Sequence, residues 1–222
     1  MKYKIGASIL SAKFSHLADE IERAEKSGVD FIHFDVIDTS FANFISFGPL
    51  LIRSLRDLTS LPFDVHCYVA NPLKCIKEIV EAGANSVTVH LEMADNLTHV
   101  IDYIKQNNVK AGVALLPETH PESLKYIIEK LDIATVVGID LFSFGTWQFI
   151  PSQLAKIKET RQLISQRSLQ TDLQVDGGVT LNNVEEITRA GANVLVVGST
   201  LFKSKDIAQT VMSLREIIEK SA

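Results

Sequence analysis

The chain contains little that would suggest a membrane, secreted or nucleic-acid-binding protein. Of its 222 residues only 2 are cysteines and 7% are aromatic, and acidic residues outnumber basic ones to give a formal net charge of −5. Two cysteines make no disulfide framework, the apolar runs are too short to span a membrane, and no basic patch attracts nucleic acid. The first residues lack the apolar core of a secretory signal. We therefore expect a soluble, cytoplasmic protein that binds neither nucleic acid nor membrane.

What the sequence does contain is a regular alternation of short apolar segments with longer amphipathic ones. The apolar segments predict strands near residues 4–8, 30–36, 63–67, 85–90, 109–114, 133–138, 172–176 and 193–197. The amphipathic segments predict helices near residues 14–27, 48–58, 72–82, 96–107, 121–130, 151–167, 181–190 and 206–219. No linker or shift of composition interrupts this alternation, so we expect residues 1–222 to form one domain.

Three segments of the chain resemble one another, at residues 26–35, 81–90 and 189–198. Each contains a glycine where a helix would end in the left-handed conformation, and a predicted strand follows the glycine. Repeated helix–glycine–strand units in a chain of this length predict a (β/α)8 barrel. The alternative, an open doubly wound sheet, usually has a glycine-rich dinucleotide loop after its first strand, and residues 7–11 contain no glycine.

Polar side chains interrupt the apolar strands at their C-terminal ends, where barrel enzymes place their catalytic groups. His33 and Asp35 alternate onto the same face of the second strand, the third strand ends in His66, and the seventh ends in Asp176. Imidazole and carboxylate groups together suit a divalent ion such as Zn, Fe, Mn or Co. A single histidine or aspartate at a strand end is explained without a metal, as a buried polar group that forms a hydrogen bond with a neighbour. Together, two carboxylates on strands without lysine or arginine near them favour a bound cation.

Further candidates follow other strands. The seventh strand is followed by Gly177 and Gly178, and the eighth by Gly198 and Ser199. Backbone N–H groups of such loops can bind phosphate, but the same residues would also suit simple tight turns. His90 ends the fourth strand on the inward face, although it could equally begin a loop.

At these positions the sequence resembles the ribulose-phosphate 3-epimerase family, which includes the allulose-6-phosphate 3-epimerases. The similarity runs essentially from end to end. It is most specific at residues 32–38 (IHFDVID), 63–66 (FDVH) and 175–179 (VDGGV). The resemblance implies a barrel of the ribulose-phosphate-binding type, a small ketose phosphate as substrate, and a homo-oligomer, either a dimer or larger.

The resemblance also implies roles for individual residues. One divalent metal ion would be held by His33, Asp35, His66 and Asp176. The two aspartates would act as an acid/base pair that inverts C3 of the ketose phosphate through an enediolate. The implied substrate-binding residues are Ser8, His66, Gly145, Gly177, Gly178, Gly198 and Ser199.

The sequence departs from the family around the substrate. Three methionine positions that line the family's cavity are Ile37, Tyr68 and Gly138 here. The family's phosphate loop Pro-Gly-Phe-Gly-Gly-Gln reads Phe-Ser-Phe-Gly-Thr-Trp at residues 142–147. Fewer glycines and added aromatic rings hinder close approach of the backbone to a phosphate. We therefore expect the same chemistry on a different or less usual substrate.

Two other functions remain open at this stage. A lyase or decarboxylase on a related barrel typically has an Asp-x-Lys-x-x-Asp element at a strand end or a Schiff-base lysine, and no predicted strand here ends in lysine. A non-catalytic sugar-phosphate-binding protein would explain the altered loops but not the complete set of histidines and aspartates.

Overall fold

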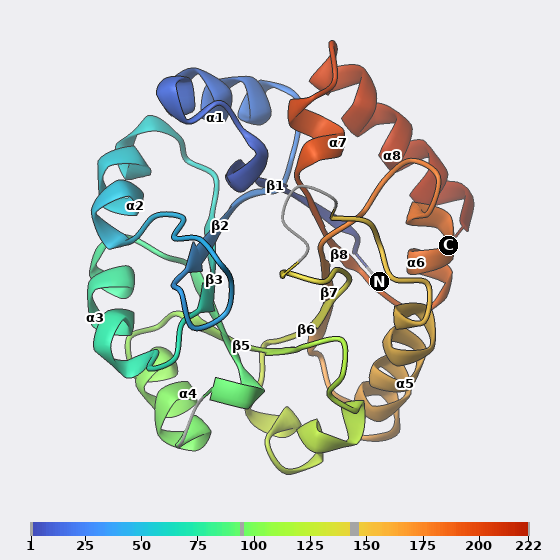
Figure 1. Cartoon of the computed structure of the whole chain (residues 1–222). Helices are drawn as coiled ribbons and strands as arrows, with labels where there is room; N and C mark the ends of the chain where they lie inside the picture. The colour runs from blue at the N-terminus through green and yellow to red at the C-terminus, as the bar shows by residue number, and fades with distance from the viewer. Residues whose placement is uncertain (1, 94–95, 143–146, 222) are drawn as a thin grey trace.

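The computed structural model describes residues 2–93, 96–142 and 147–221. Eight parallel strands pair in sequence order, and β1 also pairs with β8, so the sheet closes into a barrel. The α-helices lie outside the strands as an outer ring (Figure 1). The predicted (β/α)8 barrel is confirmed. No helix in the described ranges is long and apolar enough to cross a membrane.

The elements follow the sequence prediction closely. The strands are β1 (Lys4–Ser8), β2 (Phe31–Ile37), β3 (Phe63–Tyr68), β4 (Ser86–His90), β5 (Lys110–Leu115), β6 (Ile133–Val137), β7 (Asp172–Asp176) and β8 (Val194–Val197). The helices are α1 (Leu17–Lys26), α2 (Pro49–Leu55), α3 (Leu73–Glu81), α4 (Leu97–Gln106), α5 (Gln153–Gln166), α6 (Val184–Arg189), α7 (Ser199–Phe202) and α8 (Ile207–Ser221).

One predicted helix is wrong. Residues 121–130 form two 3₁₀ segments, Pro121–Tyr126 and Ile128–Lys130, instead of one α-helix. Between them Ile127 has a φ of −127°, which lies outside the helical region and interrupts the segment. The short helix α7 directly after β8 was not predicted as a separate element.

The alternation within β2 separates the apolar core from the polar site. Ile32, Phe34 and Val36 are buried in the main core between the strands and the helices. His33 and Asp35, on the opposite face, are buried inside the barrel. The predicted orientation of this strand is confirmed, and it delivers two polar side chains to the C-terminal end of the barrel.

The same hydrogen-bonding arrangement recurs four times at the N-terminal end of the barrel and joins neighbouring strands. An Asp or Asn directly precedes each even-numbered strand and accepts a hydrogen bond from a backbone N–H of the odd-numbered strand before it. The distances are 2.8 or 2.9 Å, and the residues are Asp30, Asn85, Asp132 and Asn193. Each of these side chains also accepts from a cation of a helical segment, in the same order Arg215, Arg56, Lys105 and Arg161. The last three cations lie in the segment before the odd-numbered strand, whereas Arg215 lies in α8, the last helix of the chain.

We call these four groups the strand-start clamps. Three of them fall on the repeated segments seen in the sequence. The fourth, at Asp132, follows Lys130 where the other repeats have glycine, so the sequence comparison did not include it. The repeated segments therefore join neighbouring strands at the N-terminal end of the barrel, opposite the end that holds the polar cluster.

Candidate active site

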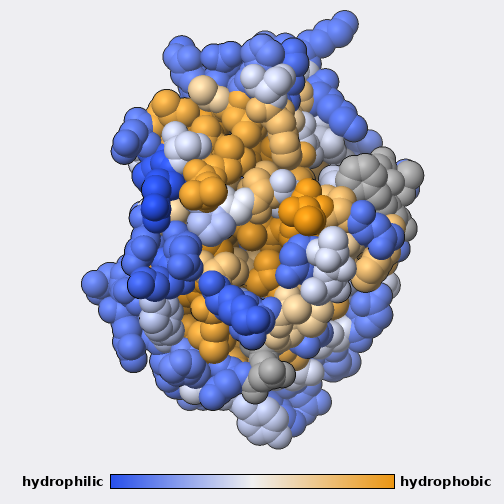
Figure 2. Space-filling model, turned by 60° about the vertical axis from the view of Figure 1, so that its left-hand side comes forward, coloured by the Kyte–Doolittle hydropathy of each residue, from blue (hydrophilic) through white to orange (hydrophobic). Residues whose placement is uncertain are grey.

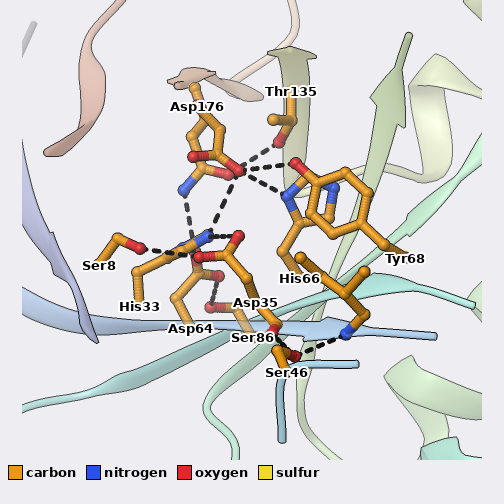
Figure 3. A network of polar contacts seen from close by, with 12 residues as sticks. Ser8, His33, Asp35, Ser46, Asp64, His66, Tyr68, Ser86, Thr135 and Asp176 are labelled. Carbon is orange, nitrogen blue, oxygen red and sulfur yellow. Dashed lines mark hydrogen bonds and ion pairs between the residues drawn. The ribbon is translucent and has the colours of Figure 1, made fainter. Parts of the chain in front are cut away.

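Four buried side chains from three strands converge at the C-terminal end of the barrel (Figure 3). His33 and Asp35 come from β2, His66 from β3 and Asp176 from the end of β7. One possible ligand atom from each residue lies within 4.8 Å of the others. The His66 Nδ1 atom is 2.8 Å from Asp176 Oδ2, and the His33 Nε2 atom is 3.2 Å from Asp35 Oδ1. The structure thus brings together the four residues that the sequence analysis selected.

The charges of this cluster call for a cation. In the described part of the chain, Asp35 and Asp176 form ion pairs with histidines and with no lysine or arginine. Burial raises the pKa of Asp176, but His33 and His66 outweigh burial and hold that pKa well below its usual range. Burial lowers the pKa of His33, and the two carboxylates reverse this and raise it well above its usual value. Positive charge is therefore stabilised between the carboxylates, and the nitrogen and oxygen donors suit a divalent transition ion.

Asp64, which the sequence analysis did not select, orients His33. Its Oδ2 atom lies 2.8 Å from Nδ1 of His33 and accepts a hydrogen bond of 2.9 Å from Nε2 of Gln174. The hydroxyl of Ser86 also donates to Asp64, and the hydroxyl of Thr135 donates to Gln174 at 2.8 Å. With Nδ1 engaged, Nε2 of His33 faces the two carboxylates, as in carboxylate–histidine–metal sites. The signal in the sequence was the position of Asp64 two residues before His66, on the same face of β3.

His90 supports the second histidine rather than beginning a loop. It is buried at the end of β4, its Nε2 atom lies 3.0 Å from Nε2 of His66, and the two rings stack 4.9 Å apart. Its Nδ1 atom lies 3.3 Å from the carboxylate of Glu92. Burial, opposed mainly by Glu92, lowers the pKa of His90 to about 4. His90 therefore packs against His66 as a neutral ring at neutral pH.

Each carboxylate of the cluster also accepts one hydrogen bond from a hydroxyl group (Figure 3). Ser8 donates to Oδ2 of Asp35 at 2.7 Å, and Tyr68 donates to Oδ2 of Asp176 at 3.0 Å. Ser8 was expected to contact substrate, and it lies directly beside the cluster. In the sequence Tyr68 stands out only as a departure from the family, because a sequence does not show which carboxylate a tyrosine reaches.

A cavity of about 60 Å³ lies beside the cluster, with Ser8, Asp35, Tyr68 and Asp176 among its lining residues. Its wall includes four more of the predicted substrate-binding residues, namely Gly177, Gly178, Gly198 and Ser199. The predicted His66 is buried in the cluster and is not among the residues that line the cavity. Leu10, Ser11, Trp147 and Ser199 line both this cavity and a neighbouring groove of about 570 Å³. The predicted Gly145 lies outside the described residues.

The two glycines after β7 are required by their surroundings. Gly177 and Gly178 have φ values of 100° and 73°, which favour glycine. A Cβ atom on Gly178 would lie 2.4 Å from the backbone nitrogen of Phe149. The backbone can therefore approach the cavity closely at these two positions.

Known proteins resemble this chain over nearly its whole length. The model of the ribulose-phosphate 3-epimerase family matches residues 4–202. The ribulose-phosphate 3-epimerase of Escherichia coli is 34% identical over 220 residues, covering 99% of this chain and 97% of that protein. The enzyme of the same name from Bacillus subtilis is 37% identical over 213 residues, covering 96% and 98%.

Solved structures agree on the fold. A 3-hexulose-6-phosphate synthase has a TM-score of 0.72 at 18% identity, covering 97% of this chain and 99% of its own. The thiamine phosphate pyrophosphorylase of Pyrococcus furiosus has a TM-score of 0.66 at 15% identity, covering 99% and 96%. Together with the family match over nearly the whole chain and the 34% identity to a named epimerase, these findings show that the chain belongs to the ribulose-phosphate 3-epimerase family and is a carbohydrate epimerase.

Proposed function

We propose that this protein inverts C3 of a ketose phosphate, either ribulose 5-phosphate or a related pentulose or hexulose phosphate. The observation that carries the proposal is the buried cluster of two histidines and two carboxylates within 4.8 Å. His33, Asp35, His66 and Asp176 would hold one divalent ion. When bound, such an ion supplies Lewis acidity toward the carbonyl and hydroxyl oxygens of the substrate and so eases removal of the C3 proton.

Asp35 and Asp176 are the proposed acid/base pair. They come from strands β2 and β7, both border the same cavity, and both lie close to His33 Nε2, at 3.2 and 3.5 Å. One carboxylate removes the C3 proton, and the other returns a proton to the opposite face of the carbon.

The phosphate end of the substrate would lie against the backbone of the last two βα loops. Gly177, Gly178, Gly198 and Ser199 line the cavity. Lys203 is the one lysine or arginine on the described lining of the cavity and the adjoining groove, and it lies on the groove side. Because Tyr68 and Trp147, at two positions where the sequence departs from the family, line the cavity, we propose a substrate that differs from the family's usual one in size or in its terminal group.

A deuterium-exchange experiment tests the proposed function. The protein is loaded separately with Co²⁺, Mn²⁺, Fe²⁺ or Zn²⁺ and incubated in D₂O with a panel of ketose phosphates and free ketoses. We expect deuterium at C3 and formation of the C3 epimer, both lost after treatment with a chelator. If no compound of the panel exchanges deuterium at C3, the proposed reaction is wrong. If ribulose 5-phosphate is the best substrate of the panel, the proposed change of substrate is wrong.

We also propose a cytoplasmic homo-oligomer. Ile45, Leu50 and Leu73 are exposed apolar side chains. Figure 2 shows apolar side chains gathered on the face turned toward the viewer when the side of α2 and α3 comes forward. Exposed apolar patches often mark protein interfaces. Sedimentation at micromolar concentration should give a dimer or larger, and a monomer would contradict the proposal.

A further inference from the structure

Tyr68 ends β3 with its hydroxyl group inside the active site. The side chain is buried, and its ring packs on the ring of His66, with 3.9 Å between the ring centroids. The ring of Phe41 meets it edge-on at 5.7 Å. These contacts fix the ring, so the hydroxyl has one direction available, toward Oδ2 of Asp176 at 3.0 Å. The phenol group of tyrosine is protonated near neutral pH, so the hydroxyl is a donor.

The hydrogen bonds of Asp176 fall on one of its two oxygens. Oδ2 accepts from Tyr68 and lies 2.8 Å from Nδ1 of His66 and 3.5 Å from Nε2 of His33. Within the described ranges, Oδ1 has no hydrogen bond, and Asp176 borders the cavity. Oδ1 is therefore the oxygen that a substrate can approach.

The other carboxylate has a matching hydroxyl. Ser8, at the end of β1, donates to Oδ2 of Asp35 at 2.7 Å. Ser8 and Tyr68 both line the cavity together with the two aspartates. Each half of the acid/base pair is thus held by one hydroxyl group from a different strand.

We propose that Tyr68 is the positioning residue of Asp176: its hydroxyl holds Oδ2 so that Oδ1 faces C3 of the substrate and exchanges the proton, as Ser8 restrains Asp35. The inference rests on the proposed epimerase activity. In the step, the C3–H bond breaks, the proton goes to a carboxylate oxygen, and the electron pair moves toward the C2 carbonyl oxygen. Protonation of C3 by the other carboxylate returns the electrons.

The variant Tyr68→Phe keeps the ring and removes the hydroxyl. Ser8→Ala is its counterpart on Asp35, and Tyr103→Phe, in α4, is the matched control. The Co²⁺-loaded proteins react in D₂O, starting from ribulose 5-phosphate and, separately, from its C3 epimer. For each direction the measured quantity is the ratio of deuterium in recovered substrate to product formed.

We expect kcat of Tyr68→Phe to fall about tenfold, with KM unchanged within about twofold, since a hydrogen bond to a charged group is lost. In the direction in which Asp176 delivers the proton, product formation slows and the ratio of deuterium in the substrate to product should rise. In the other direction Asp176 returns deuterium to the substrate, so the ratio should fall. Ser8→Ala should show the opposite asymmetry, and Tyr103→Phe should match the wild type. An equal change of the ratio in both directions would mean general loosening of the site and would overturn the inference.

Crystal structures of the Co²⁺-loaded wild type and Tyr68→Phe provide a test that needs no substrate. We expect the carboxylate of Asp176 to rotate by more than about 30°, or to split between two rotamers, when the hydroxyl is absent. An unchanged Asp176 would overturn the inference. If the wild type shows no exchange with either sugar phosphate, that result counts against these substrates, and the crystallographic comparison still decides the role of Tyr68.

Discussion

Both ends of the barrel contain carboxylates, but the carboxylates have different ion-pair partners at the two ends. At the N-terminal end, half-buried Asp30, Asp132 and Asp172 pair with Arg215, Lys105 and Lys4. At the C-terminal end, Asp35 and Asp176 are only 4% and 6% exposed, and histidines are their ion-pair partners in the described chain.

This difference separates stability from chemistry. A carboxylate paired with lysine or arginine at a partly exposed site is neutralised by the chain itself and gives modest stability. Two buried carboxylates without such a partner are costly unless a cation joins them. The N-terminal end is therefore neutralised by the chain itself, whereas the buried cluster at the C-terminal end is compatible with a bound metal ion. Four changes test this contrast.

The largest effect should come from the two carboxylates at the C-terminal end. Asp35→Asn and Asp176→Asn each remove a proton acceptor and a proposed metal ligand, so C3 exchange should fall at least about 10³-fold. Asp132→Asn, at the opposite end, should retain exchange within about twofold. NMR detection of deuterium at C3 measures both. Full activity of either active-site variant would remove that residue from the acid/base pair.

Metal removal should destabilise the protein through the C-terminal end alone. At a concentration of Zn²⁺ about 100 times Kd, binding adds about 2.7 kcal/mol. Stripping the metal should therefore lower Tm by roughly 5–10 °C for a chain of this size. Differential scanning calorimetry with and without chelator measures the shift. In the variant His33→Asn, removal of the metal should not change Tm. If removal of the metal leaves the Tm of the wild type unchanged, the proposed metal site is wrong.

A change in a strand-start clamp should affect stability without affecting chemistry. Asn193 accepts from the N–H of Leu173 and from Arg161, and donates to Asp172. Asn193→Ala removes the acceptor of the buried Leu173 N–H and one partner each of Arg161 and Asp172, and should lower the free energy of unfolding by about 2 kcal/mol. Urea unfolding measures the loss, with the exposed Asn182→Ala as control. Loss of exchange activity in the folded variant would show that the two ends are not independent.

The smallest effect should come from Asp64, which connects the two ends. Asp64 bonds His33 and also lines a cavity of about 300 Å³ at the N-terminal end. Asp64→Asn should weaken Zn²⁺ binding about tenfold, because His33 loses its charged partner. Asp172→Asn, which changes the same cavity without touching His33, should leave Kd unchanged. Competition with a chromophoric chelator measures Kd. If Asp64→Asn binds Zn²⁺ as tightly as the wild type does, Asp64 contributes to packing alone.

The sequence predicted what depends on local pattern. The eight strands follow from apolar runs, and inward placement of His33 and Asp35 follows from alternation along β2. The convergence of His33, Asp35, His66 and Asp176 follows because the C-terminal ends of parallel strands meet. These inferences need only the period of a strand and the geometry of a barrel.

Contacts across the barrel were beyond such reasoning. Asp64 reaches Gln174, 110 residues away, and Tyr68 reaches Asp176, 108 residues away. Those contacts depend on the register and rotamers of several strands at once. The helix predicted at residues 121–130 was wrong for a local reason. The periodicity of the segment fits an α-helix, but the backbone conformation of Ile127 does not.

The strand-start clamps also order the events by which the barrel folds. Three of them join a cation to its Asp or Asn partner across 29, 27 or 32 residues, whereas Arg215 and Asp30 are 185 residues apart. Short loops close at lower entropic cost than long ones, and distant contacts form slowly. We expect the three local clamps to form while the chain is still open. The contact between Arg215 and Asp30 must wait for α8, so ring closure is a late event that depends on the last helix.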